Sequence, residues 1–393
     1  MHYSNKYTAK ITPVRLNNFL DNRFYIIRQL RPLIIFQALL GVSRLYLLKP
    51  KKIFEWLSYC FSFLAMLLLC YSLLQDNYVG ATYIVFKCTS CIEFLILVLT
   101  SILLQRRSMT EFFKNLEAFD RIMNIQKDVV ITVPMHRPIL WLILSTFITT
   151  IEFFVLFESS FAYSITNLTI MVHDAEQVFF GTMLRTILQR VRIVKARVIK
   201  VCDRTSEETR KRKNLDKVEA LSRKSEHGIS SLHEVYESLH KCAEQLNSVM
   251  SFPIMTMLLA SGLSTIILLK YAFSIFQAND ESKDLLLLVY IFIRCLKYTI
   301  LVIIPCYYSS KTTTQVSIIR KTLHDALNND QYVFVSDKID CRRLKAFFQL
   351  TRDSEFAYAL WGVINLNMSL PLSYISLCTT YLVIIIQFSK FID

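Results

Sequence analysis

The chain has 393 residues, of which 53% are hydrophobic and only 19% are charged, and its mean hydropathy is +0.38. A soluble globular domain is nearer a quarter charged, so this composition excludes an ordinary soluble protein. Glycine and proline number only 6 and 8, which favours long helices over sheets or disordered linkers. We therefore predict an all-α, polytopic membrane protein.

Seven segments are apolar over the roughly 20 residues that a helix needs to cross the hydrocarbon of a bilayer. We predict transmembrane helices at residues 56–74, 83–104, 139–156, 161–184, 252–269, 285–304 and 366–388. The fourth is the weakest of these, because it contains His173, Asp174 and Glu176. A further apolar stretch begins at Leu33, but it contains Arg44 and lies beside basic residues, so we predict an interfacial or half-buried helix there.

The positive charge is concentrated in alternate connections. Residues 1–53, 105–138, 185–251 and 305–365 hold 39 of the 45 lysines and arginines. Cytoplasmic loops carry such an excess, so we predict a cytoplasmic N-terminus and an extracellular tail at residues 389–393. This alternation requires the weak fourth segment to cross the membrane. We therefore predict transmembrane helices one to four within residues 54–184, helices five and six within residues 252–304, and the seventh helix at residues 366–388. The net charge of +14 then belongs to the cytoplasmic surface, and no nucleic-acid partner is expected.

The cytoplasmic connections have a helical period. Apolar residues recur at steps of three or four from Leu184 to Val201 and from Leu232 to Met250, and residues 338–362 form a third such segment leading into the last span. We predict that residues 185–251 extend the fourth and fifth spans inward and that residues 305–365 complete a helical anchor bundle. Such a bundle could join subunits, or it could be a solvated bundle within one subunit.

Charged residues inside the predicted spans are functional candidates, because charge in hydrocarbon is costly. The helix rise places Glu93, Asp174, Arg294 and Lys297 at a similar middle depth. Opposite charges at one depth predict pairing between helices. The pairs could fix helix packing only, or they could take part in ion passage or gating.

Polar residues of the last span fall on one stripe. At about 100° per residue the stripe covers roughly 80° of the helix, and its members are Asn365, Ser369, Ser373, Ser376, Thr380 and Gln387. Repeated around an axis, such a helix would line a pore. Interhelical packing through small hydroxyl residues is an equal alternative on the stripe alone.

The end of this span resembles the signature of the insect gustatory receptors, TYhhhhhQF. Thr380 and Tyr381 are followed by five apolar residues and then by Gln387 and Phe388, so every fixed position matches. The stretch LRPLIIFQALLGV from Leu30 is also similar to the N-terminal pattern of that family. The resemblance implies a taste receptor in the plasma membrane of sensory neurons, a ligand-gated non-selective cation channel formed as a homo- or heterotetramer with related receptors. It also implies that the last helix lines the pore.

The resemblance places Gln387 and Phe388 at the outer constriction of the pore, with Ile384 adding to an apolar collar. A small-molecule tastant would bind among the outer halves of the helices. Aromatic residues predominate there, which suits a bitter or otherwise aversive compound better than a sugar. The candidates are Tyr83, Glu152, Phe153, Phe157, Tyr163, Thr166 and Tyr290. A sugar or another taste ligand remains the alternative.

Other functional classes have weaker support. The chain has no glycine-rich phosphate loop and no HExxH, and its Cys88-Thr-Ser-Cys91 lies within a predicted span, so neither an enzyme nor a metal or other cofactor is expected. A G-protein-coupled receptor needs an extracellular N-terminus, against the charge distribution. A transporter would tend to have repeated halves with broken helices.

Overall fold

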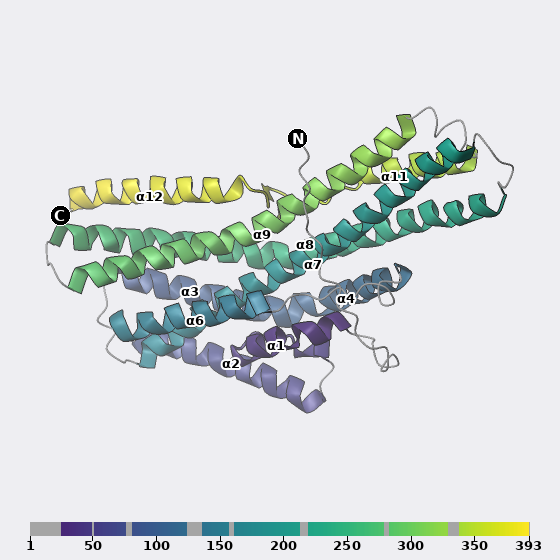
Figure 1. Cartoon of the computed structure of the whole chain (residues 1–393). Helices are drawn as coiled ribbons and strands as arrows, with labels where there is room; N and C mark the ends of the chain where they lie inside the picture. Colours follow the sequence, from purple (N-terminus) through teal and green to yellow (C-terminus); the bar gives the residue numbers. More distant parts are fainter. Residues whose placement is uncertain are drawn as a thin grey trace.

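The computed structural model describes residues 25–48, 51–75, 81–123, 136–156, 161–212, 219–278, 283–328 and 338–392. It is a bundle of long helices with one small hairpin (Figure 1). The elements are α1 Tyr25–Leu39, the 3-10 turn η1 Leu45–Leu48, α2 Lys52–Gln75, α3 Ala81–Leu99, the π-helical turn η2 Thr100–Leu104, α4 Gln105–Ile122, α6 His136–Leu156, α7 Phe161–Arg212, α8 Glu219–Ala278, α9 Lys283–Asn328, α11 Lys338–Asp353, β1 Ala359–Leu360, β2 Ile364–Asn365 and α12 Leu370–Ile392.

Apart from residues 366–369, the predicted spans fall on helices, which confirms the helical membrane-protein fold. Four helical stretches of the described chain are long and apolar enough to cross a membrane, namely Lys52–Ser72, Lys87–Ile122, Ile229–Phe273 and Leu288–Asn328, and Pro138–Thr150 and Leu370–Ile384 are shorter apolar helices. The predicted fourth span lies in α7, which contacts α1, α2, α3, α6, α8 and α9. Because α7 is surrounded by other helices, its polar residues do not need to face lipid.

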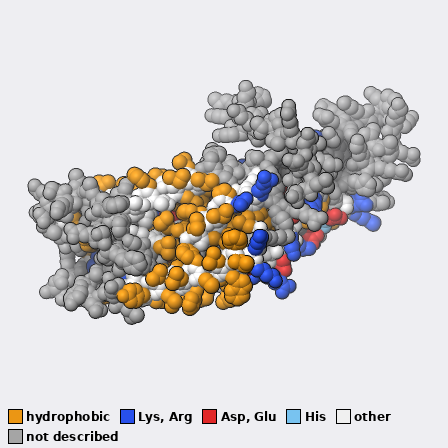
Figure 2. Space-filling view, turned by 90° about the horizontal axis from the view of Figure 1, so that it is seen from below, with side chains coloured by type: hydrophobic (Ala, Val, Ile, Leu, Met, Phe, Trp, Pro, Cys, Tyr) orange, Lys and Arg blue, Asp and Glu red, His pale blue; other side chains and the backbone are white. Residues whose placement is uncertain are grey.

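The outer faces of the peripheral helices are apolar. Trp56 and Leu57 of α2 are 69% and 63% exposed, and Leu103 is 70% exposed. Figure 2 shows a broad hydrophobic face with lysine and arginine side chains along one edge. This pattern fits a surface that meets acyl chains and ends at a headgroup layer. Helix α1 has Arg28 and Arg31 exposed and its other face buried, which agrees with the predicted half-buried helix as far as Leu39. Beyond Leu39 the predicted stretch is a turn followed by η1, so the helical prediction was wrong for that part.

The fourth and fifth predicted spans continue as helix beyond the membrane-crossing length, as predicted, and the side of the membrane on which they extend stays a prediction. Helices α7, α8 and α9 have 52, 60 and 46 residues, far more than a membrane crossing needs. Outside the predicted spans these helices pack with α4 and α11 (Figure 1). The core there is aromatic: Tyr236 of α8 lies 5.7 Å from Phe347 and 5.4 Å from Phe356 between ring centroids. His233 and His240 pack on the same two phenylalanine rings, at 6.1 and 5.3 Å.

The segment before the last helix differs from the prediction. Helix α11 ends at Asp353, and the chain then forms the antiparallel pair of β1 and β2 before α12 begins at Leu370. The turn between the strands needs positive φ at Trp361 (51°) and Gly362 (70°), which a helix cannot accommodate. The Trp361 N–H donates to the Ser251 hydroxyl at 2.7 Å, which fixes the hairpin on α8. The predicted helix over residues 354–362 and the predicted start of the last span at residue 366 were therefore wrong.

Candidate functional site

A cluster of buried polar side chains lies in the middle of the bundle. Lys297 of α9 donates to Asp174 Oδ2 of α7 at 2.8 Å, and both side chains are almost fully buried. The Ser145 hydroxyl of α6 donates to the same carboxylate oxygen. The predicted pairing of opposite charges between helices is thus confirmed for Asp174 and Lys297. Three helices meet at this carboxylate.

Arg294, one turn from Lys297, donates to two tyrosine hydroxyls on its own helix. The Tyr290 oxygen accepts from Nη1 at 3.3 Å and the Tyr298 oxygen from Nη2 at 3.2 Å. Its guanidinium carbon lies 5.7 Å from the centre of the Tyr298 ring, and Lys297 Nζ lies 5.5 Å from that ring. Tyr290 is a predicted ligand residue, and the structure places its hydroxyl beside this arginine rather than free in a pocket.

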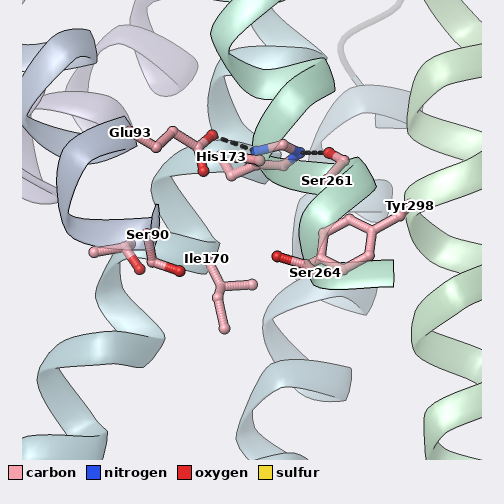
Figure 3. A pocket seen from close by; sticks show the side chains of 9 residues that line it. Ser90, Glu93, Ile170, His173, Ser261, Ser264 and Tyr298 are labelled. Carbon is pink, nitrogen blue, oxygen red and sulfur yellow. Dashed lines mark hydrogen bonds and ion pairs between the residues drawn. The ribbon is translucent and has the colours of Figure 1, made fainter. Parts of the chain in front are cut away.

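Glu93 is paired with a histidine. Its Oε1 lies 2.5 Å from Nδ1 of His173, and Nε2 of that ring lies 3.1 Å from the Ser261 hydroxyl (Figure 3). A carboxylate can only accept a hydrogen bond, so Nδ1 carries the proton of this contact. The imidazole therefore bridges α3 and α8 from its position on α7.

A small pocket opens beside this histidine. The volume open to the centre of a water-sized sphere is only about 10 Å³, and the lining is mixed polar and apolar (Figure 3). The lining residues are Ser90, Glu93, Thr169, Ile170, His173, Ala260, Ser261, Ser264 and Tyr298. A cavity needs roughly 10–15 Å³ by this measure to hold one water, so the space suits a single water or one small polar group and not a whole drug-sized ligand.

A second buried ion pair joins the N-terminal segment to the bundle. Arg44 binds both carboxylate oxygens of Glu176, at 2.5 and 2.8 Å, and its Nη2 also donates to Gln105 at 2.6 Å. Gln37 of α1 donates to the same Glu176 at 2.8 Å. The ion pair with Glu176 neutralises the charge of Arg44, which was the reason for predicting an interfacial helix in the segment from Leu33.

Helix α12 lies along one side of the bundle and contacts α8 and α9 (Figure 1). Pro371, Tyr374 and Cys378 are buried and form its contact face. At about 100° per residue, the predicted stripe lies on roughly the opposite face. The members Ser373, Ser376, Thr380 and Gln387 are all exposed, and so is Ile384 of the predicted collar. Ser369 precedes the first helical residue, where its N–H and hydroxyl donate to Asn367 Oδ1 at 3.1 and 2.5 Å. Asn365 lies in β2 and is not on the helix.

Several predicted site residues cannot be placed. Phe157 lies outside the described residues. The side chains of Tyr83, Glu152, Phe153, Tyr163, Thr166 and Phe388 also lie outside the described part, although their backbones are helical. The proposed outer ligand pocket and the collar at Phe388 therefore remain predictions.

The sequence prediction missed most of the pocket. Ser90, Ser261, Ser264 and Tyr298 give no motif signal, because a lone serine or tyrosine in a span is common. His173 was noted only as a reason to doubt the fourth span. The sequence did hold one usable signal. The imidazole of His173 lies at a similar depth to Glu93, and a buried carboxylate needs a hydrogen-bonding partner, so the two could have been predicted to pair.

Comparisons with known proteins agree with this architecture. The family model described as 7tm Chemosensory receptor matches residues 30–392. A comparison with curated protein sequences finds no match. Among solved structures, the insect olfactory receptor OR5 from Machilis hrabei matches with a TM-score of 0.59 and 13% sequence identity, covering 93% of this chain and 100% of that chain. The same receptor in complex with eugenol matches with a TM-score of 0.57, at the same identity and coverage.

The structural likeness extends over nearly the whole bundle, but at this identity it shows the fold alone. The family model rests on the sequence itself and covers most of it, from the half-buried N-terminal helix to the end of α12. The chain belongs to the 7tm chemosensory receptor family.

Proposed function

We propose that the chain is a gustatory receptor that works as a ligand-gated, non-selective cation channel. The observation that carries the proposal is the direction of the polar stripe on α12. Its hydroxyls and Gln387 point away from the subunit's own helices, while Tyr374 and Cys378 hold the opposite face against α8 and α9. A polar face in that position needs water or another polar surface, because lipid offers no hydrogen bonds.

A pore between subunits satisfies this requirement. Four copies of α12, or a similar number, around one axis would place the stripes of Ser373, Ser376 and Thr380 along a water-filled path. At its outer end Gln387 can solvate a passing ion, and Ile384 with Phe388 would form an apolar collar. The bundle formed by α7, α8, α9 and α11 would hold the subunits of this homo- or heterotetramer together.

The motif favours taste over smell. Thr380, Tyr381, Gln387 and Phe388 occupy every fixed position of the gustatory signature, whereas the two solved structures compared above are of an olfactory receptor. We therefore place the protein in the plasma membrane of sensory neurons.

The proposed ligand is a small bitter or aversive organic compound. The outer halves of the predicted spans are rich in aromatic residues and poor in hydrogen-bonding groups, unlike a sugar site. The complex of Machilis hrabei OR5 with eugenol gives a precedent for a small aromatic ligand on this fold. A sugar or another taste ligand is the alternative within the same function.

Current recording in Xenopus oocytes tests the proposal. Oocytes that express the chain, alone and with related receptors, are exposed to quinine, eugenol and sucrose. We expect quinine or eugenol to evoke a current that persists when Na⁺ is replaced by K⁺ and when GDP-β-S blocks G proteins. A response to sucrose only would overturn the ligand class. A current abolished by GDP-β-S would overturn the channel mechanism.

A further inference from the structure

A chain of hydrogen bonds leads from the small pocket to α12. It begins at Glu93 of α3, passes through His173 of α7 and reaches the Ser261 hydroxyl on α8, with contacts of 2.5 and 3.1 Å (Figure 3). All three side chains line the pocket. The wall of the pocket is therefore itself one continuous polar connection between three helices.

The connection continues along α8. Thr265 lies one turn beyond Ser261, and its hydroxyl donates to the Ser261 backbone carbonyl at 2.8 Å. The same hydroxyl oxygen lies 3.0 Å from the hydroxyl of Tyr374 on α12. A threonine hydroxyl has one proton, and here it is used on the carbonyl. Tyr374 must therefore be the donor, and Thr265 the acceptor, in the bond that joins α8 to α12.

Tyr374 is well placed to control α12. It belongs to the narrow contact face of that helix, and its neighbour on this face, Cys378, approaches the Gly262 carbonyl of α8 with its sulfur at 4.0 Å. A Cβ added at Gly262 would meet the Tyr374 ring at 3.7 Å, an ordinary contact, so the ring lies directly against this turn of α8. A shift of α8 at Ser261 and Thr265 would therefore move the atoms that Tyr374 and Cys378 of α12 contact.

We infer that Ser261, Thr265 and Tyr374 are positioning residues that couple the occupancy of the pocket to the position of α12. The inference rests on the proposed function, because it assigns the coupling between the ligand and the pore. A polar group that enters the pocket competes with Ser261 for the imidazole. The released serine changes the local geometry of α8, and Thr265 passes that change to Tyr374.

A double-mutant cycle tests the coupling. Ser261→Ala and Tyr374→Phe each remove one hydroxyl, and the readouts are the half-maximal concentration of quinine or eugenol, whichever evokes current, and the current without ligand. Surface biotinylation measures the amount of receptor. We expect each single variant to shift the half-maximal concentration, and the double variant to differ from the product of the single effects by about threefold or more.

Threonine variants supply the matched control. Thr265→Val should reproduce the effect of Tyr374→Phe. Thr256 also donates to a carbonyl four residues earlier on α8, at 3.1 Å, so Thr256→Val removes the same group from the same helix outside the connection. We expect it to leave the half-maximal concentration unchanged.

Two results separate the possible failures. Effects of Ser261→Ala and Tyr374→Phe that multiply independently, or that change surface level only, would overturn the coupling and leave the proposed channel intact. A wild-type receptor that reaches the surface but carries no current, with or without ligand, would overturn the proposed function and this inference with it.

Discussion

The buried pair of Asp174 and Lys297 gives a prediction whose size follows from the structure. In Lys297→Met the carboxylate of Asp174 loses its cation and keeps the hydrogen bond from Ser145, while Oδ1 has no hydrogen-bond partner among the described residues. Leaving one charge of a buried pair uncompensated costs about 3–5 kcal/mol. Replacing both partners by neutral groups of similar size removes that cost, so Asp174→Asn combined with Lys297→Met should recover most of the stability.

Thermal unfolding of the detergent-solubilised receptor, followed by fluorescence-detected gel filtration, measures this effect. We expect Lys297→Met to lower the unfolding midpoint by about 5 °C or more. Arg107→Gln is the matched control, because this side chain is 90% exposed and its bond to Glu111 is a surface pair, a class worth at most about 1 kcal/mol. If Lys297→Met melts like Arg107→Gln, or if the double variant is no more stable than the single one, the pair does not hold α7 and α9 together.

Three further predictions concern other parts of the chain. An N-terminal tag should be cytoplasmic and a C-terminal tag extracellular; antibody labelling of an N-terminal tag on intact cells would refute the orientation. Gln387→Ala should change the single-channel conductance while the amount of receptor at the surface stays normal, and Phe388→Ala should raise the current without ligand. If Gln387→Ala instead lowers the amount of surface receptor and leaves the conductance unchanged, the amide is a packing group. Burial raises the pKa of the Cys242 thiol to about 12, so at pH 8 it stays protonated and maleimide should label the half-buried Cys341 before Cys242; equal labelling of these two residues would show that the bundle opens.

Local patterns account for the parts of the fold that were predicted correctly. An apolar run long enough to cross a bilayer has few alternatives to a helix, so the segment at residues 56–74 is found within α2. The period of three or four likewise identified Leu232 and Leu239, which are buried in the extension of α8. These features depend on neighbours within one or two turns.

Features that depend on distant residues were not predicted. Arg44 and Glu176 are 132 residues apart, and nothing near either residue identifies its partner. The hairpin of β1 and β2 has strands of two residues, too short for a period-two pattern to be read. Its turn relies on positive φ at Trp361, an uncommon conformation for a residue other than glycine, so residues 354–362 were wrongly predicted to be helical.

The pocket was missed for a related reason. Its polar lining comes from α3, α7, α8 and α9, and each helix contributes only a few groups. Polar residues of the last span were found because they repeat along a single helix. A stripe on one helix is visible in the sequence, whereas a site shared among four helices is not.

The central claim is that the exposed stripe of α12 lines a cation path, and cysteine accessibility tests it most directly. A positively charged methanethiosulfonate reagent is applied from outside to Thr380→Cys and, as the control, to Ile375→Cys. Ile375 is also exposed on α12 but lies about 130° from the stripe. The account predicts that the reagent reduces the current of Thr380→Cys, faster with ligand than without, and leaves Ile375→Cys and the wild type unaffected. Modification of Ile375→Cys with no effect on Thr380→Cys would contradict it.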